Sequence, residues 1–213
     1  MKKYVFLITL FVAYSIFINS CPVVTQWDRN FIVFVQALLK DFPTIIPLLP
    51  DFSLYSIMIA IPLIFGTVYF FKKKLYPEIF CILSVPLVTF LLNCIVKPLI
   101  HRERPPYELQ IAVHPDSFSY VSSHSLVTAC VWAMVCFFIF KYSKNVIARR
   151  IALFVALIWT LFVGFSRVWL GVHNPTDVLG AYILASILVL TYIDLLKFFN
   201  SKIKPCLLYT SDA

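Results

Sequence analysis

Six long apolar runs constrain the fold of this chain more than any other feature of its sequence. They are residues 4–20, 52–71, 79–100, 123–140, 151–169 and 175–198. A helix needs about 20 predominantly apolar residues to cross the hydrocarbon core of a bilayer. Polar segments that hold lysines, arginines or prolines separate the runs. Each run is therefore predicted to be a transmembrane helix.

The composition excludes a soluble globular domain. Of the 213 residues, 61% are hydrophobic and 13% are charged, whereas about 25% of the residues in an ordinary soluble domain are charged. We therefore expect an all-α, polytopic membrane bundle in which residues 1–205 form one domain. The net charge of +8 does not indicate nucleic-acid binding, because the basic residues flank apolar runs and no soluble basic domain is present to carry that activity.

The distribution of basic residues predicts the orientation of the bundle. Of the 18 Lys and Arg residues, 12 fall on the side that carries both termini and six fall on the opposite side. Cytoplasmic loops are rich in Lys and Arg. Both termini are therefore predicted to be cytoplasmic, in the inner or plasma membrane. The polar motifs described next are predicted to face the periplasm or the cell exterior.

The segment Ser166–Asp177 joins the last two runs and holds ionisable residues in apolar surroundings. Its end has the pattern of a helix start, with Asn174 as the N-cap, Pro175 in the first helical position and Asp177 in the third. His173 then precedes the cap and lies close to Asp177. A carboxylate beside one imidazole nitrogen leaves the other nitrogen available as a nucleophile or base.

Two further polar segments, Lys97–Pro105 and Ser119–Ser125, lie at run ends on the same predicted side. Transfer of a phosphoryl group requires cations for the phosphate oxygens, a nucleophile and a proton donor for the leaving oxygen. The cations here are Lys97, Arg104 and Arg167. The next run begins with Ser122, Ser123 and His124, and the free N–H groups of a helix start bind anions. These residues are the candidate phosphate-binding site.

The order and spacing of these residues resemble the type 2 phosphatidic acid phosphatase family, whose motifs are KxxxxxxRP, PSGH and SRxxxxxHxxxD. The first and third motifs match at every defined position. The second departs from the family at Val121, in place of proline, and at Ser123, in place of glycine. Glycine permits close approach of the backbone to a phosphate, so we expect reduced preorganisation with activity kept.

The resemblance implies a role for each catalytic candidate. It implies that His173 is the nucleophile and forms a phosphohistidine, and that Asp177 orients it. It implies that His124 protonates the leaving group. No cofactor is expected, and no metal site is expected because the nearby cations would repel a metal ion. His101, Arg102, Glu103 and His114 lie outside the motifs and are expected to be solvated loop residues.

These observations predict metal-independent hydrolysis of a lipid phosphate monoester or diphosphate at the outer face of the membrane. A lipid substrate follows from motif residues at span ends, where headgroups lie. The family includes enzymes for several lipids, and undecaprenyl diphosphate or a phosphatidate is the weak preference. The alternatives are a phosphatase or phosphotransferase for a soluble ester, a non-catalytic headgroup-binding protein, and a transporter. The sequence does not indicate an oligomeric state.

Three other segments lie outside the motifs. The first run ends at Ser20–Cys21 and allows two interpretations, a cleaved signal of the lipoprotein type or a retained span; the family resemblance favours the span. Residues 26–39 have the pattern of an amphipathic interfacial helix. Residues 206–213 are expected to be a non-native tail. The six cysteines have no CxxC spacing and are expected to be small hydrophobic residues rather than disulfides or zinc ligands.

Overall fold

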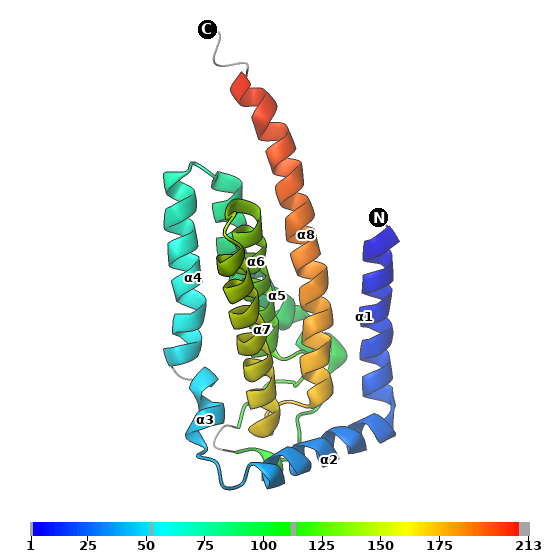
Figure 1. Ribbon diagram of the computed structural model, residues 1–213. Coiled ribbons are helices and arrows are strands. Elements are labelled where there is room, and N and C mark those ends of the chain that lie inside the picture. The colour runs from blue at the N-terminus through cyan, green and yellow to red at the C-terminus, as the bar shows by residue number, and fades with distance from the viewer. Residues whose placement is uncertain (1, 52, 112–113, 209–213) are drawn as a thin grey trace.

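The fold is an all-α membrane bundle, as the sequence predicts. It comes from a computed structural model that describes residues 2–51, 53–111 and 114–208, in which no strand occurs (Figure 1). The α-helices are α1 Lys2–Ser20, α2 Pro22–Leu38, α3 Ile45–Leu48, α4 Ser53–Lys72, α5 Tyr76–Ile100, α6 Ser123–Tyr142, α7 Val146–Trp169 and α8 Pro175–Leu208. Two short 3₁₀ helices, η1 Leu49–Asp51 and η2 Tyr107–Leu109, lie in the connections.

A helix occupies each of the six predicted spans. Five helices of the described chain, α1, α5, α6, α7 and the 175–201 part of α8, are long and apolar enough to cross a membrane. The remaining predicted span is α4, of which residues 56–72 count as a shorter apolar helix. The starts of α1, α4, α5, α6 and α8 lie within three residues of the predicted limits. The start of α7 lies five residues before its predicted limit, because Asn145 caps the helix there and its side chain accepts from the N–H groups of Ile147 and Ala148.

The last helix is longer than its predicted span. The apolar run ends near Phe198, but α8 continues to Leu208. Hydropathy reports the length that fits in a bilayer, whereas the residues beyond the run can extend the same helix into water. The predicted non-native tail, 206–213, begins in this last turn, and its residues 209–213 lie outside the described part of the chain.

The first helix makes polar contacts with the rest of the bundle along its length. Near its start, Lys3 Nζ lies 2.6 Å from a carboxylate oxygen of Asp194 in α8. Near its end, Tyr14 donates to the carbonyl of Thr176 at 2.9 Å, and the Ser15 and Tyr120 hydroxyls lie 2.8 Å apart. These contacts support a retained first span, which stays a prediction.

The amphipathic segment forms α2, which runs across the end of the bundle (Figure 1). Its buried face carries Asp28, Ile32 and Val35. Trp27 and Phe34 lie on an exposed face, with 51% and 60% of their surfaces accessible. This arrangement suits a helix at a membrane interface, since one apolar face meets the bundle and another is left for lipid.

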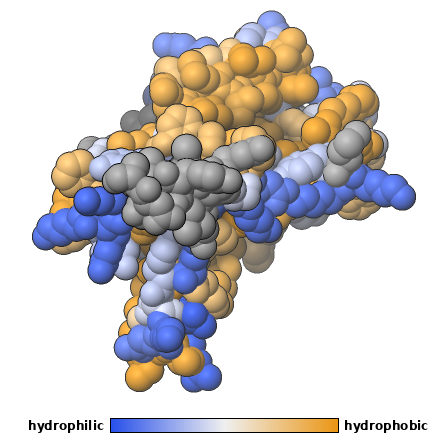
Figure 2. All heavy atoms as spheres, turned by 90° about the horizontal axis from the view of Figure 1, so that it is seen from above, coloured by the Kyte–Doolittle hydropathy of each residue, from blue (hydrophilic) through white to orange (hydrophobic). Residues whose placement is uncertain are grey.

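The core lies mainly between α5, α6 and α8, where Val85, Met134 and Leu196 are buried. Large hydrophobic side chains also cover the outside, for example Phe90 on α5 and Phe154 on α7, which are 62% and 66% exposed. Figure 2 looks onto the end at which α8 finishes. Hydrophilic side chains reach outward there, and hydrophobic atoms lie beside them. An apolar exterior is expected for a bundle whose solvent is lipid.

Five of the six cysteines have side chains that the structure describes, and they divide between the core and the exterior, whereas the side chain of Cys206 lies outside the described part. Cys81 and Cys130 are buried, Cys21 and Cys136 are half-buried, and Cys94 is exposed. The expectation that they act as small hydrophobic residues is therefore met inside the core, while Cys94 is on the apolar outer face of α5.

Gly180 in α8 allows a close contact that positions the loop before α6. A Cβ atom at this position would lie 2.3 Å from the ring of Tyr120, which is fully buried. We expect Gly180→Ala to lower the free energy of unfolding by about 1–3 kcal/mol, because overpacking forces side chains and backbone to move. Thermal unfolding in detergent, followed by tryptophan fluorescence, would measure this. Ser186→Ala on the exposed face of the same helix is the control, and an equal midpoint for both variants would contradict the prediction.

Candidate active site

The candidate site lies at the end of the bundle where α5 and α7 finish and α6 and α8 begin. A cavity of about 230 Å³ is found there. Its walls are formed by Lys97, Arg104, Pro115, Ser117, Ser123, His124, Arg167, Val172 and His173. Six of the eight predicted site residues therefore line one cavity. The two others, Ser122 and Asp177, are fully buried beside it.

The start of α8 has the geometry that the sequence predicts. Pro175 is the first residue of the helix, and the N–H of Asp177 donates to the carbonyl of Asn174 at 3.0 Å. The Asp177 carboxylate in turn accepts from the N–H of Asn174 at 2.8 Å. The second bond is the half of a capping box in which the side chain of the third helical residue accepts from the N-cap N–H. It fixes the carboxylate next to His173.

His173 is held between a carboxylate and the cavity. Its Nδ1 lies 3.7 Å from an Asp177 oxygen and 3.4 Å from the Ser119 hydroxyl, which donates to the same carboxylate. Its Nε2 lies 3.5 Å from Nη1 of Arg104 on the cavity wall. The ring therefore has one nitrogen on the acidic side and one on the basic side.

Burial keeps the His173 imidazole neutral. Only 4% of the residue is exposed. Burial lowers the pKa of His173 to about 3, the positive charges of Arg104 and Lys97 act in the same direction, and Asp177 opposes them. A neutral imidazole has an unprotonated nitrogen that can attack an electrophile.

Three cations surround the cavity, and protein oxygens hold each of them. Lys97 Nζ donates to the carbonyl of Phe118 at 2.9 Å. Arg104 donates from Nε to the Ser117 carbonyl at 2.6 Å and from Nη1 to the carbonyl of Val172.

The third cation, Arg167, is 2% exposed and donates to the Ser166 hydroxyl at 3.1 Å and to the Pro47 carbonyl at 3.2 Å. Burial lowers the pKa of the Arg104 side chain, as expected for a cation that is taken out of water near other cations. The three positive charges would bind an anion in this cavity favourably. Their hydrogen bonds to protein oxygens orient the three side chains before an anion binds.

The first turn of α6 completes the cavity wall. Ser123 and His124 line the cavity, and the first N–H groups of a helix have no intrahelical acceptor. The side chain of Ser122 does not line the cavity, and the predicted part of this residue in phosphate binding stays a prediction. Its hydroxyl is the N-cap, which accepts from the Ser125 N–H at 3.5 Å and from the Ser125 hydroxyl at 3.0 Å. Its side chain is therefore used by the helix and does not line the cavity.

Arg102 corrects one expectation, since it is buried rather than a solvated loop residue. It is 5% exposed, Nη2 donates to Asp28 at 2.7 Å, and Nη1 donates to Asp177 and to the Thr176 hydroxyl. The other three residues of that group, His101, Glu103 and His114, are exposed as expected. Arg102 is drawn in because α2 brings a second buried carboxylate, Asp28, to the same point.

Asp28 is the part of this network that the sequence analysis missed. It is fully buried, and it also accepts from the Thr176 N–H at 3.2 Å and the Thr176 hydroxyl at 2.6 Å. A signal was present in the sequence, since Asp28 shares the i, i+4, i+7 stripe of Ile32 and Val35. A charged residue in an otherwise apolar stripe indicates a buried partner.

The described part of the chain holds no group of three His, Cys, Asp or Glu side chains that could bind a metal ion. Metal independence itself stays a prediction. The carbonyls of two residues that line the cavity, Ser117 and Val172, accept hydrogen bonds from Arg104.

The chain is similar to known phosphatases over most of its length. The PAP2 superfamily matches residues 78–201, a segment that includes all eight predicted site residues. Phosphatidylglycerophosphatase B of Bacillus subtilis (strain 168) is 35% identical over 153 residues, which make up 70% of each chain. The crystal structure of the first transmembrane PAP2 type phosphatidylglycerolphosphate phosphatase from Bacillus subtilis matches with a TM-score of 0.74 and 31% identity, over 95% of this chain and 98% of that chain.

Proposed function

The chain belongs to the PAP2 superfamily and is a phosphatase of this type, and we propose that it hydrolyses the phosphomonoester of phosphatidylglycerophosphate at the membrane surface. The observation that carries the proposal is the position of His173 between Asp177 and a cavity lined by three cations. The activity named for the similar Bacillus subtilis phosphatase and for the similar solved structure supports this substrate over undecaprenyl diphosphate or a phosphatidate, the preference drawn from sequence.

Binding uses the cations and the start of α6. The phosphate oxygens would lie against Lys97, Arg104 and Arg167, with N–H groups of the first turn of α6 on another side. Arginine can bind two phosphate oxygens at once, whereas lysine acts as a point charge. The carbonyl and hydroxyl contacts of these side chains keep them in place before the substrate arrives, which reduces the reorganisation needed in the transition state.

In the first chemical step, His173 Nε2 attacks the phosphorus in line with the leaving oxygen. The N–P bond forms as the bond between phosphorus and the glycerol oxygen breaks. His124 gives its proton to that oxygen, so phosphatidylglycerol leaves as an alcohol. Asp177 stabilises the positive charge that develops on the imidazole.

In the second step, water attacks the phosphohistidine. His124, now neutral, accepts a proton from the water as the O–P bond forms and the N–P bond breaks. Inorganic phosphate is released, and both histidines return to their starting protonation states. No metal takes part in either step.

Arg102 and Asp28 are positioning residues in this scheme. They lie behind Asp177 and do not line the cavity that would hold the phosphate. Arg102 bridges the two carboxylates and so fixes the orientation of Asp177. The chain of contacts runs from the interfacial helix α2 to the nucleophile.

The site would face the periplasm or cell exterior. The described ends of α1 and α8 point toward the same end of the bundle, and the site lies at the other end (Figure 1). The excess of basic residues on the terminal side supports a cytoplasmic location for both termini. The lipid headgroup would then reach the cavity while its acyl chains stay in the outer leaflet.

The test measures phosphate release by the purified protein in detergent with EDTA present. The substrates are phosphatidylglycerophosphate, phosphatidate, undecaprenyl diphosphate and glucose 6-phosphate. We expect release from phosphatidylglycerophosphate with the highest kcat/KM. Release only from glucose 6-phosphate would identify a phosphatase for soluble esters, and a requirement for added metal would contradict the mechanism. Folded protein that releases phosphate from none of these lipids would support a headgroup-binding protein.

The neutral state of His173 gives a prediction for pH. Because burial lowers the pKa of His173 to about 3, the imidazole should remain unprotonated and nucleophilic from pH 8 down to pH 5. A histidine in water has a pKa near 6.5 and would be mostly charged at pH 5. NMR of histidine-labelled protein should show one ring signal without titration over this range, and that signal should be missing in His173→Gln. Titration of the assigned signal between pH 6 and 7 would contradict the prediction.

A further inference from the structure

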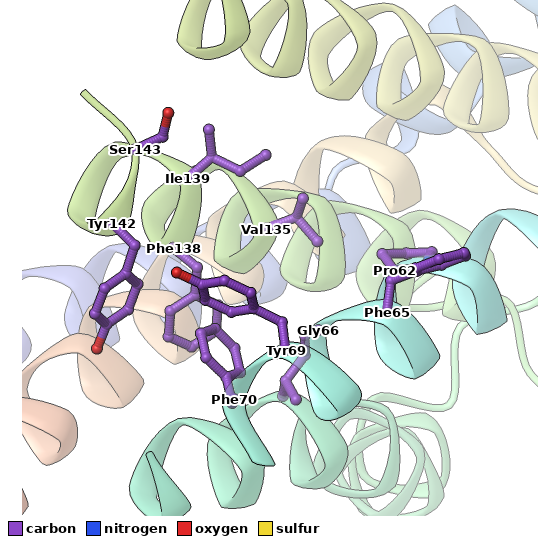
Figure 3. Close-up of a pocket in the computed structure, with 11 residues that line it drawn as sticks. Pro62, Phe65, Gly66, Tyr69, Phe70, Val135, Phe138, Ile139, Tyr142 and Ser143 are labelled. Carbon is purple, nitrogen blue, oxygen red and sulfur yellow. The ribbon is translucent and has the colours of Figure 1, made fainter. Parts of the chain in front are cut away.

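A second cavity lies between α4 and α6, near the end of the bundle opposite the active site. Its volume is about 370 Å³ (Figure 3). Pro62, Phe65 and Gly66 of α4 contribute to one wall, and Val135, Phe138 and Ile139 of α6 contribute to the other. The lining is almost entirely apolar, and it has no part in the proposed catalysis. We call this cavity the α4–α6 groove.

The α4–α6 groove has a closed inner wall and an open outer edge. Inside, the ring of Phe70 packs edge-on against Phe138 with 4.8 Å between centroids. Gly66 lets α4 pack closely on α5, since a Cβ at this position would lie 2.6 Å from Ile82. At the outer edge, Phe65 is 71% exposed. In a membrane this edge opens sideways into lipid, so an acyl chain can enter without crossing the bundle.

Polar groups gather at one end of the groove. Tyr142, which lines it, donates to Glu78 at 2.5 Å, and Lys141 donates to the same carboxylate oxygen at 2.8 Å. Glu78 is fully buried, and its ion pair with Lys141 balances the charge of that lysine. The hydroxyl of Tyr69 lies near the same end in the close-up (Figure 3).

Further basic residues surround this end without acidic partners in the described chain. Lys72 follows Tyr69 by less than one helical turn, and Lys144 follows Ser143, another lining residue. Arg149 is fixed at the rim, because Nε donates to the Ser143 carbonyl at 2.8 Å and Nη2 donates to the Phe140 carbonyl at 2.9 Å. Figure 2 looks onto this end of the molecule and shows hydrophilic side chains around its edge.

We propose that the α4–α6 groove binds an anionic diacyl glycerophospholipid, with one acyl chain in the groove and the headgroup phosphate against Lys72, Lys144 and Arg149. The apolar lining matches the chain, and the basic rim matches the negative headgroup. Basic residues beside a pocket between transmembrane helices favour anionic lipids. The acyl chain of a zwitterionic lipid would fill the groove equally well. Its headgroup would be attracted less strongly by the basic residues at the rim. This inference does not depend on the proposed function.

The first test compares two lipids with the same acyl chains, phosphatidylglycerol and phosphatidylcholine. Native mass spectrometry of the full chain in neutral detergent counts the lipids that remain bound. We expect retention of phosphatidylglycerol at a lipid concentration about tenfold or more below the concentration that phosphatidylcholine requires. This difference follows from the two or three cations at the rim. Equal retention of the two lipids would overturn the proposal.

Variants then locate the bound lipid. Ile139→Trp should fill the groove and remove lipid retention, while Ile64→Trp, on the exposed face of α4, should leave it unchanged. Lys72→Gln with Lys144→Gln should weaken phosphatidylglycerol retention by about tenfold or more and leave phosphatidylcholine unchanged. Lys2→Gln with Lys197→Gln is the matched control, since both residues lie near the same end but away from the groove.

Lipid bound in the active site instead would not respond to these groove variants, and that result would overturn the proposal. A change in oligomeric state in Ile139→Trp, with retention unchanged, would show a contact between copies and would also overturn it. If Ile139→Trp fails to fold, the exposed lysine variants decide the question.

Discussion

His173→Ala is expected to abolish phosphate release, with kcat/KM lowered by about 10,000-fold or more. Such a loss corresponds to about 5.4 kcal/mol of transition-state stabilisation. The physical reason is that His173 supplies the only imidazole nitrogen placed between Asp177 and the cavity in the described chain. Without it, water must attack the phosphate monoester directly, because the other imidazole in the cavity wall, His124, is the proposed proton donor for the leaving oxygen. Phosphate release in detergent with EDTA measures the effect.

His114→Ala is the matched control, because His114 is exposed and lies outside the cavity. It should keep full activity. Wild-type protein mixed rapidly with radiolabelled substrate should also form an acid-labile phosphoenzyme, and His173→Ala should form none. A variant that keeps more than about a tenth of wild-type activity would remove His173 from the role of nucleophile.

His124→Ala separates the two histidines. A general acid raises the reaction rate by about 100- to 10,000-fold. Its effect is largest when the leaving oxygen belongs to a poor leaving group. We therefore expect a large loss with the lipid phosphate and a smaller loss with an aryl phosphate. Equal losses for both substrates would contradict the assignment of His124 as the proton donor.

Arg102→Met is expected to lower the free energy of unfolding by about 3–5 kcal/mol, the usual cost of removing one partner from a buried ion pair. Arg102 lies between two fully buried carboxylates, Asp28 and Asp177. Without the guanidinium, the two carboxylates lose the cation that lies between them. Either one carboxylate must then bind a proton, or the packing of α2 must change. Either outcome also disturbs the orientation of Asp177, so activity should fall with stability. Thermal unfolding followed by tryptophan fluorescence measures the first effect.

A double-mutant cycle distinguishes a positioning role from a purely structural one. Asp28→Asn in the Arg102→Met background removes one of the two uncompensated charges and should recover part of the stability. Activity should recover less, because Asp177 still lacks its cation. Arg102→Lys keeps the charge but cannot reach both carboxylates with one planar group, and we expect an intermediate loss of kcat with little change in KM. An Arg102→Met protein that unfolds at the wild-type temperature would contradict this interpretation.

Much of the bundle could be predicted because the signals are local. Hydropathy over about 20 residues marks a span, and the resulting limits agree with the helices within a few residues for α1, α4, α5 and α6. The helix start at Asn174–Asp177 was predictable for the same reason, since its residues lie within three positions of one another. The end of α8 deviates more from its predicted limit, because hydropathy marks the part of a helix that lies in the membrane and not the polar turns that continue it.

The sequence predicted most of the polar residues of the cavity, but not which way each side chain points. Spacing within three motifs identified six of the nine residues that line it, although the motifs lie on separate segments of the chain. The roles of neighbouring residues were harder to assign. Ser122 stands next to Ser123 in the sequence, yet one caps α6 and the other lines the cavity. One position on a helix turns a side chain by about 100°, and the direction of the cavity is a tertiary property.

The sequence by itself determined the membrane class, the positions of the helices and the identities of the cations and histidines, because each depends on residues that are close along the chain. Only the tertiary structure decided that Arg102 is buried between Asp28 and Asp177. Asp28 is 74 residues from Arg102 in the chain, and Asp177 is a further 75. Their meeting depends on how α2 packs across the end of the bundle. A buried charge is stable only with its partner present, and that partner is placed by packing rather than by local sequence.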